Sequence, residues 1–392
     1  MSKKHPSYFI TIIFCIFIFT LPIASLLSPQ QDFSELENRY LSTQPRITLK
    51  TILDGTYFNK LETYLTDHLA GRNIFVCTKA LSEKMLGKEE NNNVFFCKDD
   101  YLIKRVEKVD SKKNSNNIDY INKFVENTTA NVYLGIIPTS ACILNSKLPK
   151  FAQTEDEKSI INNIYKNVKA TTLPILEKLD SKKEENIYYH TDIHLTSLGA
   201  YYVANSVFEN TNKTQLDIKN YIANTVATNF YGSNYSYSLA FWVKPDSIQT
   251  YIPQENKQVT KYENGKSQNI NLYNPEYLEK KDKYQYFLCG NQPLVVIKNE
   301  KVKDNSKILI IRDSYTSAIA PFISENYSEV HLIDLRYNKS STLDYISKNK
   351  ISDVVILYGF NTFATDKNIV FLNRTSQNNS KKKKNISQKE IT

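Results

Sequence analysis

The chain has 392 residues and a formal net charge of +9, with 27 Tyr and 19 Phe but only 9 Gly. Its apolar content is ample for a core, and its length allows two domains or one large domain with additions. The five cysteines show no CxxC pair and no zinc-site spacing, and neither GxGxxG nor GxxxxGK[ST] occurs, so the sequence argues against a disulfide framework and the common nucleotide-binding loops.

Residues 1–30 are predicted to be a targeting segment. The basic start Met1–His5 precedes an uncharged apolar run from Tyr8 to Leu27. This run has about the 20 residues that a membrane-spanning helix needs, and the positive residues before it predict a cytoplasmic N-terminus and an exported remainder. Because the run is long for a signal peptide, we expect an uncleaved single-pass anchor and an extracellular domain. Cleavage near Ala24 or Ser25 would instead give a secreted protein.

Residues 31–50 form a polar segment after the apolar run. Beyond it, apolar periodicity, caps and terminal glycines predict helices, and short apolar runs between turn residues predict strands. We expect the stretch at about 225–300, rich in Tyr, Asn and Lys, to form an irregular insertion of β structure and loops. The other predicted elements, in chain order, are helices at about 56–68 and 74–86, a hairpin at 93–96 and 101–104, a helix at 110–128, a strand at 131–137, mostly helix at 155–179, a strand at 187–189 and a helix that begins at Thr196 or Ser197.

The last third of the chain shows the clearest pattern. Strands at 307–311, 330–333 and 354–358 alternate with helices at about 316–325 and 341–349. This βαβαβ order implies a parallel sheet with right-handed crossovers. We therefore predict an α/β fold, a parallel sheet flanked by helices, in a single domain at 31–375. The tail at 376–392, with its charge block Lys381–Lys384, is predicted to be a disordered basic segment.

Ser314 lies where a buried strand changes into a helix. Ile308–Ile311 are consecutive apolar residues, and Arg312-Asp313-Ser314-Tyr315 follows them. A serine at such a turn places its hydroxyl beside the unpaired N–H groups that begin the helix, which suits a nucleophile next to an anion site. The alternative is that Asp313 or Ser314 only caps the helix.

The Asp192-Ile193-His194 segment supplies a candidate base for this serine. A carboxylate two residues before a histidine can hold the imidazole tautomer and stabilise the imidazolium. In a parallel sheet, the loops at 192–194 and 313–315 would meet at the C-terminal edge. The sequence therefore predicts an acyl-transfer triad of Ser314, His194 and Asp192. Alternatively, His190, Asp192 and His194 would face one way on a strand and form the zinc site of a metal-dependent hydrolase.

Blocks spread along the chain resemble the DHHW protein family, which is related to alginate O-acetyltransferases of the SGNH-like hydrolase superfamily. The resemblance covers nearly everything from Phe33 to Leu372, with the blocks in the family's order. The blocks are FSELENRYL at 33–41, DGTYFNKLETYLTDHLAGRN at 54–73, YYHTDIHLTSLGAYYVAN at 188–205, NFYGSNYS at 229–236, ILIIRDSYTSAIAPFI at 308–323, EVHLIDLRY at 329–337 and LYGFNTF at 357–363.

The resemblance implies an SGNH-like domain in which Ser314 is the nucleophile, His194 the base and Asp192 the orienting acid. Gly359-Phe360-Asn361 is similar to the Gly-x-Asn block of SGNH enzymes, which implies an oxyanion role for Asn361. Two departures stand out. Ile193 and Leu195 replace the second and fourth residues of the Asp-His-His-Trp motif. The serine follows Arg-Asp rather than Gly-Asp.

These features together predict extracytoplasmic serine-dependent acyl transfer, either O-acetylation or deacetylation of an exopolysaccharide or cell-envelope glycan. No cofactor and no nucleic acid are expected. The family resemblance implies a membrane-bound O-acyltransferase as the acyl donor. Besides the metal-dependent alternative, a basic, tyrosine-rich envelope protein without catalytic activity could bind glycan through the same fold.

Overall fold

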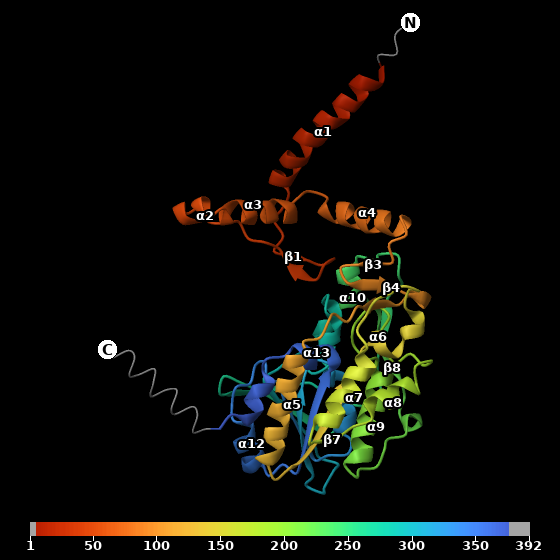
Figure 1. Ribbon diagram of the computed structural model, residues 1–392, viewed down its shortest axis with the longest axis vertical. Coiled ribbons are helices and arrows are strands. Elements are labelled where there is room, and N and C mark those ends of the chain that lie inside the picture. The colour runs from red at the N-terminus through yellow and green to blue at the C-terminus, as the bar shows by residue number, and fades with distance from the viewer. Residues whose placement is uncertain (1–4, 376–392) are drawn as a thin grey trace, which may run out of the picture. The chain divides into compact units, whose positions relative to one another are not determined.

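The computed structural model describes residues 5–375 (Figure 1). Two compact units are present: one holds the chain up to Asn92 together with Tyr235–Trp242, and the other holds Asn93–Asn234 and the chain from Val243 onward. The single domain expected at 31–375 stays a prediction. The expected basic tail at 376–392 lies outside the described residues.

The first unit begins with the apolar helix α1 (His5–Leu27), which is long and apolar enough to cross a membrane, a test that a signal sequence also passes. The helices predicted at 56–68 and 74–86 are confirmed as α3 and α4, and each follows a glycine with positive φ. The remaining elements are β1 (Phe33–Ser34), β2 (Arg39–Tyr40), α2 (Leu49–Leu53), α3 (Thr56–Asp67), α4 (Arg72–Met85) and β3 (Glu90–Asn91).

An eight-stranded mixed sheet forms the centre of the second unit, in the order β11-β10-β12-β14-β13-β15-β6-β7. Neighbouring strands from β14 to β7 are parallel, whereas β12 pairs antiparallel with β10 and β14, and β10 with β11. The strands are β6 (Asn131–Ile137), β7 (Thr171–Thr172), β10 (Lys257–Glu263), β11 (Lys266–Ile270), β12 (Leu294–Asn299), β13 (Lys307–Arg312), β14 (Glu329–Ile333) and β15 (Asp353–Gly359).

The predicted α/β fold is confirmed, and two details of the sheet differ from expectation. The sheet is mixed rather than wholly parallel, and the stretch at 225–300 is not only an irregular insertion, because it contributes β10, β11 and β12 to the sheet. The short apolar run of Val295, Val296 and Ile297 is buried within β12. Although β12 lies in a stretch rich in Tyr and Lys, it pairs with β14 and so extends the core.

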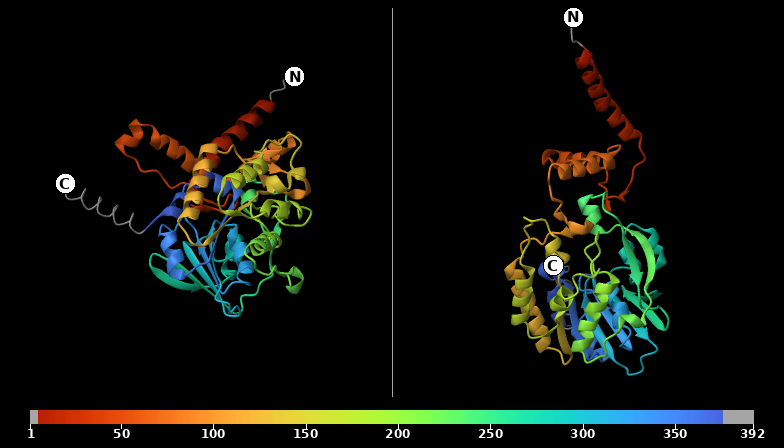
Figure 2. Two further views of the ribbon diagram at one scale, coloured as in Figure 1. Left: turned by 60° about the horizontal axis from the view of Figure 1, so that its bottom comes forward. Right: turned by 90° about the vertical axis from the view of Figure 1, so that its right-hand side faces the viewer.

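Helices flank the sheet (Figure 2), and the predicted βαβαβ order of β13, α11, β14, α12 and β15 is confirmed. The hairpin of β4 and β5 and the helices α5 and α9 also match their predictions. At 187–189 only a single bridge, between Tyr188 and Leu195, replaces the expected strand. The bounds are β4 (Val94–Phe96), β5 (Leu102–Lys104), α5 (Ser111–Glu126), α6 (Ser140–Ile143), α7 (Glu157–Asn167), α8 (Ile175–Asp180), α9 (Ser197–Asn210), β8 (Asn224–Phe230), α10 (Ser233–Ser238), β9 (Asp246–Thr250), α11 (Thr316–Ile323), α12 (Thr342–Asn349) and α13 (Phe360–Thr365).

Gly135 in β6 is required by close packing in the core. A Cβ added there would lie 2.7 Å from Cδ1 of Ile175 and 2.9 Å from Cδ1 of Leu357. Both distances are well inside van der Waals contact, so a methyl group would force the neighbouring side chains to move. The sheet therefore has no spare volume at the strand that carries this glycine.

We expect Gly135→Ala to lower the free energy of unfolding by about 1–3 kcal/mol through overpacking. Urea unfolding of the full chain measures the change. Ile175→Val removes the Cδ1 atom that the new methyl group would meet, so the double variant should lose less stability than the sum of the two single variants. An additive double variant would contradict the packing explanation.

Candidate active site

The turn after β13 is held in place by the carboxylate of Asp313. Its oxygens accept hydrogen bonds from the backbone N–H groups of Tyr315, at 3.0 Å, and Gly359, at 2.8 Å. Burial raises the pKa of Asp313, while these hydrogen bonds oppose the rise. The bond to Gly359 joins this turn to the end of β15, and the Ser314 side chain is left half-buried beside the turn at the C-terminal end of β13.

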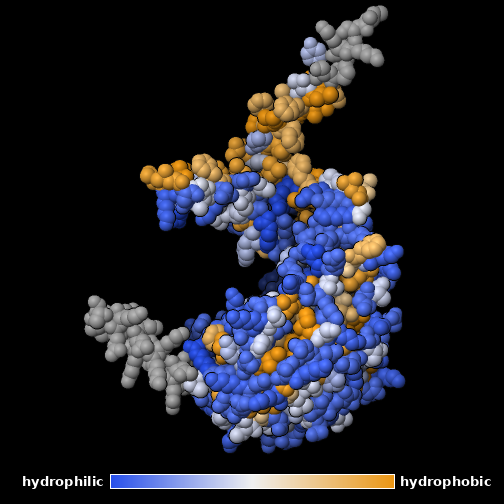
Figure 3. All heavy atoms as spheres, viewed as in Figure 1, coloured by the Kyte–Doolittle hydropathy of each residue, from blue (hydrophilic) through white to orange (hydrophobic). Residues whose placement is uncertain are grey.

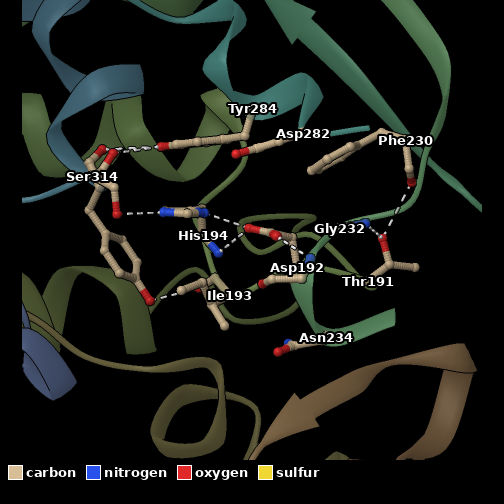
Figure 4. A network of polar contacts seen from close by, with 12 residues as sticks. Thr191, Asp192, Ile193, His194, Phe230, Gly232, Asn234, Asp282, Tyr284 and Ser314 are labelled. Atoms are coloured by element: carbon tan, nitrogen blue, oxygen red, sulfur yellow. Dashed lines mark hydrogen bonds and ion pairs between the residues drawn. The ribbon is translucent and has the colours of Figure 1, made fainter. Parts of the chain in front are cut away.

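His194 lies in a turn that the bridge between Tyr188 and Leu195 closes, just before α9. Its Nε2 is 2.8 Å from Oγ of Ser314, a residue 120 positions away along the chain. Its Nδ1 is 2.5 Å from Oδ1 of Asp192. The structure therefore brings the three side chains of the predicted triad together in one line of hydrogen bonds (Figure 4).

The carboxylate of Asp192 is buried, and both of its oxygens accept hydrogen bonds. Oδ1 also accepts the N–H of His194 at 3.0 Å, and Oδ2 accepts the N–H of Ser233 at 2.7 Å. Burial by itself would raise the pKa of Asp192, but the imidazole and these hydrogen bonds lower it to about 2. An ionised Asp192 holds the proton on Nδ1 and leaves Nε2 free to accept the Ser314 hydroxyl proton.

Two tyrosines, neither assigned a role by the sequence analysis, enclose the imidazole. Tyr284 stacks on His194 with ring centroids 3.8 Å apart and an interplanar angle of 9°, and its hydroxyl donates to the carbonyl of Ser314 at 3.2 Å. The Tyr315 hydroxyl donates to the carbonyl of Ile193 at 2.7 Å. Burial raises the pKa of both tyrosines well above the ordinary value, so both remain neutral donors. Tyr315 adjoins Ser314 in sequence, whereas no sequence signal marked Tyr284.

The segment at 229–236 supports the acid of the site through its backbone. The Gly232 N–H donates to Oγ of Thr191 at 3.0 Å, and the next N–H, of Ser233, reaches Asp192. A Cβ on Gly232 would lie 2.5 Å from Oδ2 of Asp192 and 2.7 Å from its Cγ. The close approach of Asp192 explains why a glycine stands in the sequence block NFYGSNYS.

His190 does not join Asp192 and His194. Its ring stacks on Tyr101 with centroids 3.8 Å apart, and its Nδ1 is 3.2 Å from Oδ1 of Asp246. The segment is a series of bends rather than a strand, so the three side chains do not face one way. Within residues 5–375, no group of three or more His, Cys, Asp or Glu side chains is placed to share a metal ion.

Asn361, the predicted oxyanion residue, lies on α13, which directly follows β15. Its side chain is exposed, and within the described part of the chain it makes no hydrogen bond to Ser314. The neighbouring strand β13 leads to Ser314, so both residues follow strands that pair in parallel. An oxyanion role for Asn361 remains a prediction.

Arg312 occupies the position where the resemblance expects a glycine, and it is buried. Its guanidinium donates to Oγ of Ser317 at 2.9 Å and to the carbonyl of Gly290 at 3.3 Å. Burial lowers the pKa of Arg312, and the negative charge of Asp334 opposes this effect. The arginine side chain therefore points into the core and forms its hydrogen bonds there. Ser314 remains in contact with His194.

Glu157 is a buried carboxyl group near the same sheet edge. It accepts the N–H of Thr139 at 2.7 Å and the Thr139 hydroxyl at 2.6 Å, just beyond the end of β6. Burial raises its pKa to about 7, although both hydrogen bonds favour the ionised form. Tyr188 donates to the carbonyl of Pro138 at 2.7 Å, so this loop is tied to the segment that leads to His194.

A sequence profile of the DHHW protein family matches residues 37–131 and 123–333. A search of curated proteins found no match. A crystal structure of a DHHW family protein from Eubacterium siraeum DSM 15702 is similar at 23% identity, with a TM-score of 0.65, over 73% of this chain and 96% of that chain.

Two further structures are similar at lower identity. Bacillus cereus PatB1 with a sulfonyl adduct is 18% identical, with a TM-score of 0.61, over 72% of this chain and 98% of that chain. The O-acetyltransferase domain of Pseudomonas putida AlgJ is 11% identical, with a TM-score of 0.41, over 70% of this chain and 93% of that chain. The structures of the Eubacterium siraeum protein and of PatB1 establish a shared fold with this chain.

Gly232→Ala should displace Asp192, because the added methyl group overlaps the carboxylate. We expect the bond between Asp192 and Nδ1 of His194 to weaken and the protein to lose about 1–3 kcal/mol of stability. The imidazole ¹H and ¹⁵N resonances of His194 report the bond directly. Ser233→Ala retains the backbone N–H that bonds Asp192, and its spectrum should stay close to that of the unchanged protein. An unaltered His194 spectrum in Gly232→Ala would contradict this role.

Glu157→Gln should flatten the pH dependence of stability. The folded protein raises the pKa of Glu157 from 4.5 to about 7, so its stabilising contribution is complete below 4.5 and is lost as pH rises through about 7. The loss amounts to about 3 kcal/mol at 1.36 kcal/mol per pKa unit. Glutamine cannot ionise but can still pair with Thr139. Urea unfolding at about pH 5 and about pH 8 measures the effect: relative to the unchanged protein, the free energy of unfolding of the variant should be higher at pH 8 than at pH 5. Parallel pH profiles of the two proteins would contradict the assignment.

Proposed function

The chain belongs to the DHHW protein family, and we propose that it is a serine-dependent acyltransferase or esterase with Ser314 as nucleophile, His194 as base and Asp192 as orienting acid. The observation that carries the proposal is the continuous line from Asp192 Oδ1 through the imidazole to Ser314 Oγ, with steps of 2.5 and 2.8 Å. The 2.8 Å distance between Ser314 Oγ and His194 Nε2 falls within the roughly 2.6–3.2 Å reach that a general base requires.

In the proposed reaction, Ser314 Oγ attacks the carbonyl carbon of an ester while its proton passes to Nε2 of His194. The tetrahedral intermediate then collapses, the bond to the leaving oxygen breaks, and that oxygen takes the proton from the imidazolium. An acyl-serine remains, and a sugar hydroxyl or water attacks it by the same steps in reverse. Ionised Asp192 stabilises the imidazolium throughout.

The negative oxygen of the tetrahedral intermediate needs hydrogen-bond donors. We assign this role to the Ser314 N–H and to the side chain of Asn361. Donors of this kind commonly make the largest single contribution to acyl transfer. Tyr284 and Tyr315 act as positioning residues, because they restrain the imidazole and the Ser314 backbone without reaching the hydroxyl oxygen.

The proposed substrate is an exopolysaccharide or cell-envelope glycan. Its free hydroxyl groups accept the acetyl group in the transferase reaction, and its O-acetyl esters are cleaved in the esterase reaction. The family resemblance supports this choice, and α1 would export the rest of the chain as a single-pass anchored or secreted domain. A membrane-bound O-acyltransferase would then supply the acyl group for transfer, whereas water as acceptor would make the protein an esterase. No cofactor is required by these steps.

Ser314→Ala should abolish turnover of an acetyl ester such as p-nitrophenyl acetate, with a fall in kcat of about 10³-fold or more, because the nucleophile is lost. The matched control is Ser181→Ala, which removes an exposed serine of the same unit. Equal rates for Ser314→Ala and the unchanged protein would overturn the proposed triad.

Covalent labelling tests the same assignment without a substrate. Sulfonyl fluorides react with activated serines, and a structure of PatB1 is described with a sulfonyl adduct. We expect one sulfonyl group to attach to this chain at Ser314, as peptide mass spectrometry would show, and Ser314→Ala should remain unlabelled. Labelling at another serine would contradict the assignment.

A further inference from the structure

The helices of the first unit carry apolar side chains that this unit does not cover. In α3 and α4 the buried residues are Asp67 and Ala80. Helices of this length gain most of their stability by burying an apolar face, so these faces need a partner. The exposed large apolar side chains of α2, α3 and α4, here called the apolar face, are Leu49, Ile52, Leu53, Phe58, Leu65, Ile74, Phe75, Leu81 and Met85.

The apolar face is organised as helical stripes. Ile74, Leu81 and Met85 follow one another by seven and four residues, which places them on one side of α4. Phe58 and Leu65 share one side of α3 by the same rule. Figure 3 shows apolar side chains along the side of α2 from which α1 rises, with polar side chains on the other side.

The opposite side of α3 is polar and paired. Asp67 accepts two hydrogen bonds from the guanidinium of Arg39, at 2.6 and 3.0 Å, and one from the N–H of Ser42 at 2.9 Å. The guanidinium of Arg72 pairs with Glu37. The first unit therefore separates a polar side, where charged groups pair with one another, from an uncovered apolar side.

Contacts with α1 indicate what covers the apolar face. The ring of Phe17 in α1 meets that of Phe75 in α4 edge to face, with centroids 6.4 Å apart. The Ala70 N–H donates to Oγ of Ser25 at 2.9 Å, near the end of α1. Phe17 belongs to the apolar span Tyr8–Leu27. A side chain that contacts Phe17 shares its surroundings.

We propose that α2, α3 and α4 lie in the surface of the lipid bilayer that α1 crosses, with the apolar face among the acyl chains. The proposal rests on the membrane insertion of α1 that the proposed function includes. A phospholipid bilayer is the occupant because the apolar face continues from a membrane span through Phe75. Amphipathic helices bind membranes in this way, with one side among acyl chains and the other in water. The first unit thus binds the membrane through a surface as well as through a span.

Depth-dependent fluorescence quenching tests this surface on the full chain in phosphatidylcholine nanodiscs. Trp242, the only tryptophan, is first replaced by Phe. Single tryptophans then report each helix: Phe58→Trp and Met85→Trp on the apolar face, with Lys60→Trp and Lys79→Trp as controls on exposed polar positions of the same helices. Ile16→Trp reports α1. Lipids brominated on the acyl chains quench tryptophans within the bilayer, and acrylamide quenches those in water.

We expect brominated lipid to quench the two apolar-face reporters several-fold more strongly than their controls, with acrylamide giving the reverse order. Strong lipid quenching of Ile16→Trp combined with apolar-face reporters that match their controls would overturn the proposal. Apolar-face reporters protected from both quenchers would also overturn it, because protein rather than lipid would then cover the face. Ester turnover and Ser314 labelling are measured on the same samples, so failure of the proposed chemistry is distinguishable from failure of membrane contact.

Discussion

One imidazole ring holds the candidate site together. Both nitrogens of His194 are engaged, one with a buried carboxylate and one with the hydroxyl of Ser314. This arrangement depends on Asp192 remaining ionised while buried, which is costly unless hydrogen bonds replace water. The backbone N–H groups of His194 and Ser233 provide them, and they keep the pKa of Asp192 low despite its burial. The position of the His194 ring, and with it the hydrogen bond to Ser314, therefore depends on the backbone N–H groups that bind Asp192.

The sheet makes this convergence possible. Since β13 and β15 run parallel, the turns that follow them meet at one edge, and Asp313 ties the two turns together through Gly359. The segment that bears His194 directly precedes α9 and reaches the same edge, where its Nε2 lies 2.8 Å from Ser314 Oγ. Aromatic packing then completes the site, because Tyr284 covers one face of the imidazole and hydrogen-bonds to the backbone of Ser314. The buried arginine next to this turn donates from two of its guanidinium nitrogens to Ser317 and Gly290 within the core.

The two units differ in how they treat their apolar side chains. The second unit buries its apolar residues against the sheet and can present a reactive hydroxyl in a defined place. The first unit instead leaves apolar side chains uncovered and satisfies its polar groups among themselves, a distribution suited to a boundary between water and lipid. If the proposed chemistry acts on an envelope polymer with acyl groups supplied from the membrane, a unit that lies in the membrane surface suits the protein that performs it.

The sequence by itself determined the alternating strands and helices of the last third and the apolar N-terminal span, and it singled out Ser314, His194 and Asp192 as candidates whose roles the family resemblance implied. Periodicity, caps and the spacing of a carboxylate before a histidine are local features, and local features can be recognised along one chain. Tertiary structure alone decided that β12 joins the sheet, that His190 pairs with Asp246 instead of Asp192, and that Tyr284 and Ser233 support the site. These contacts join residues far apart in the chain, and such pairings follow from how the whole core packs, so no stretch of sequence contains them.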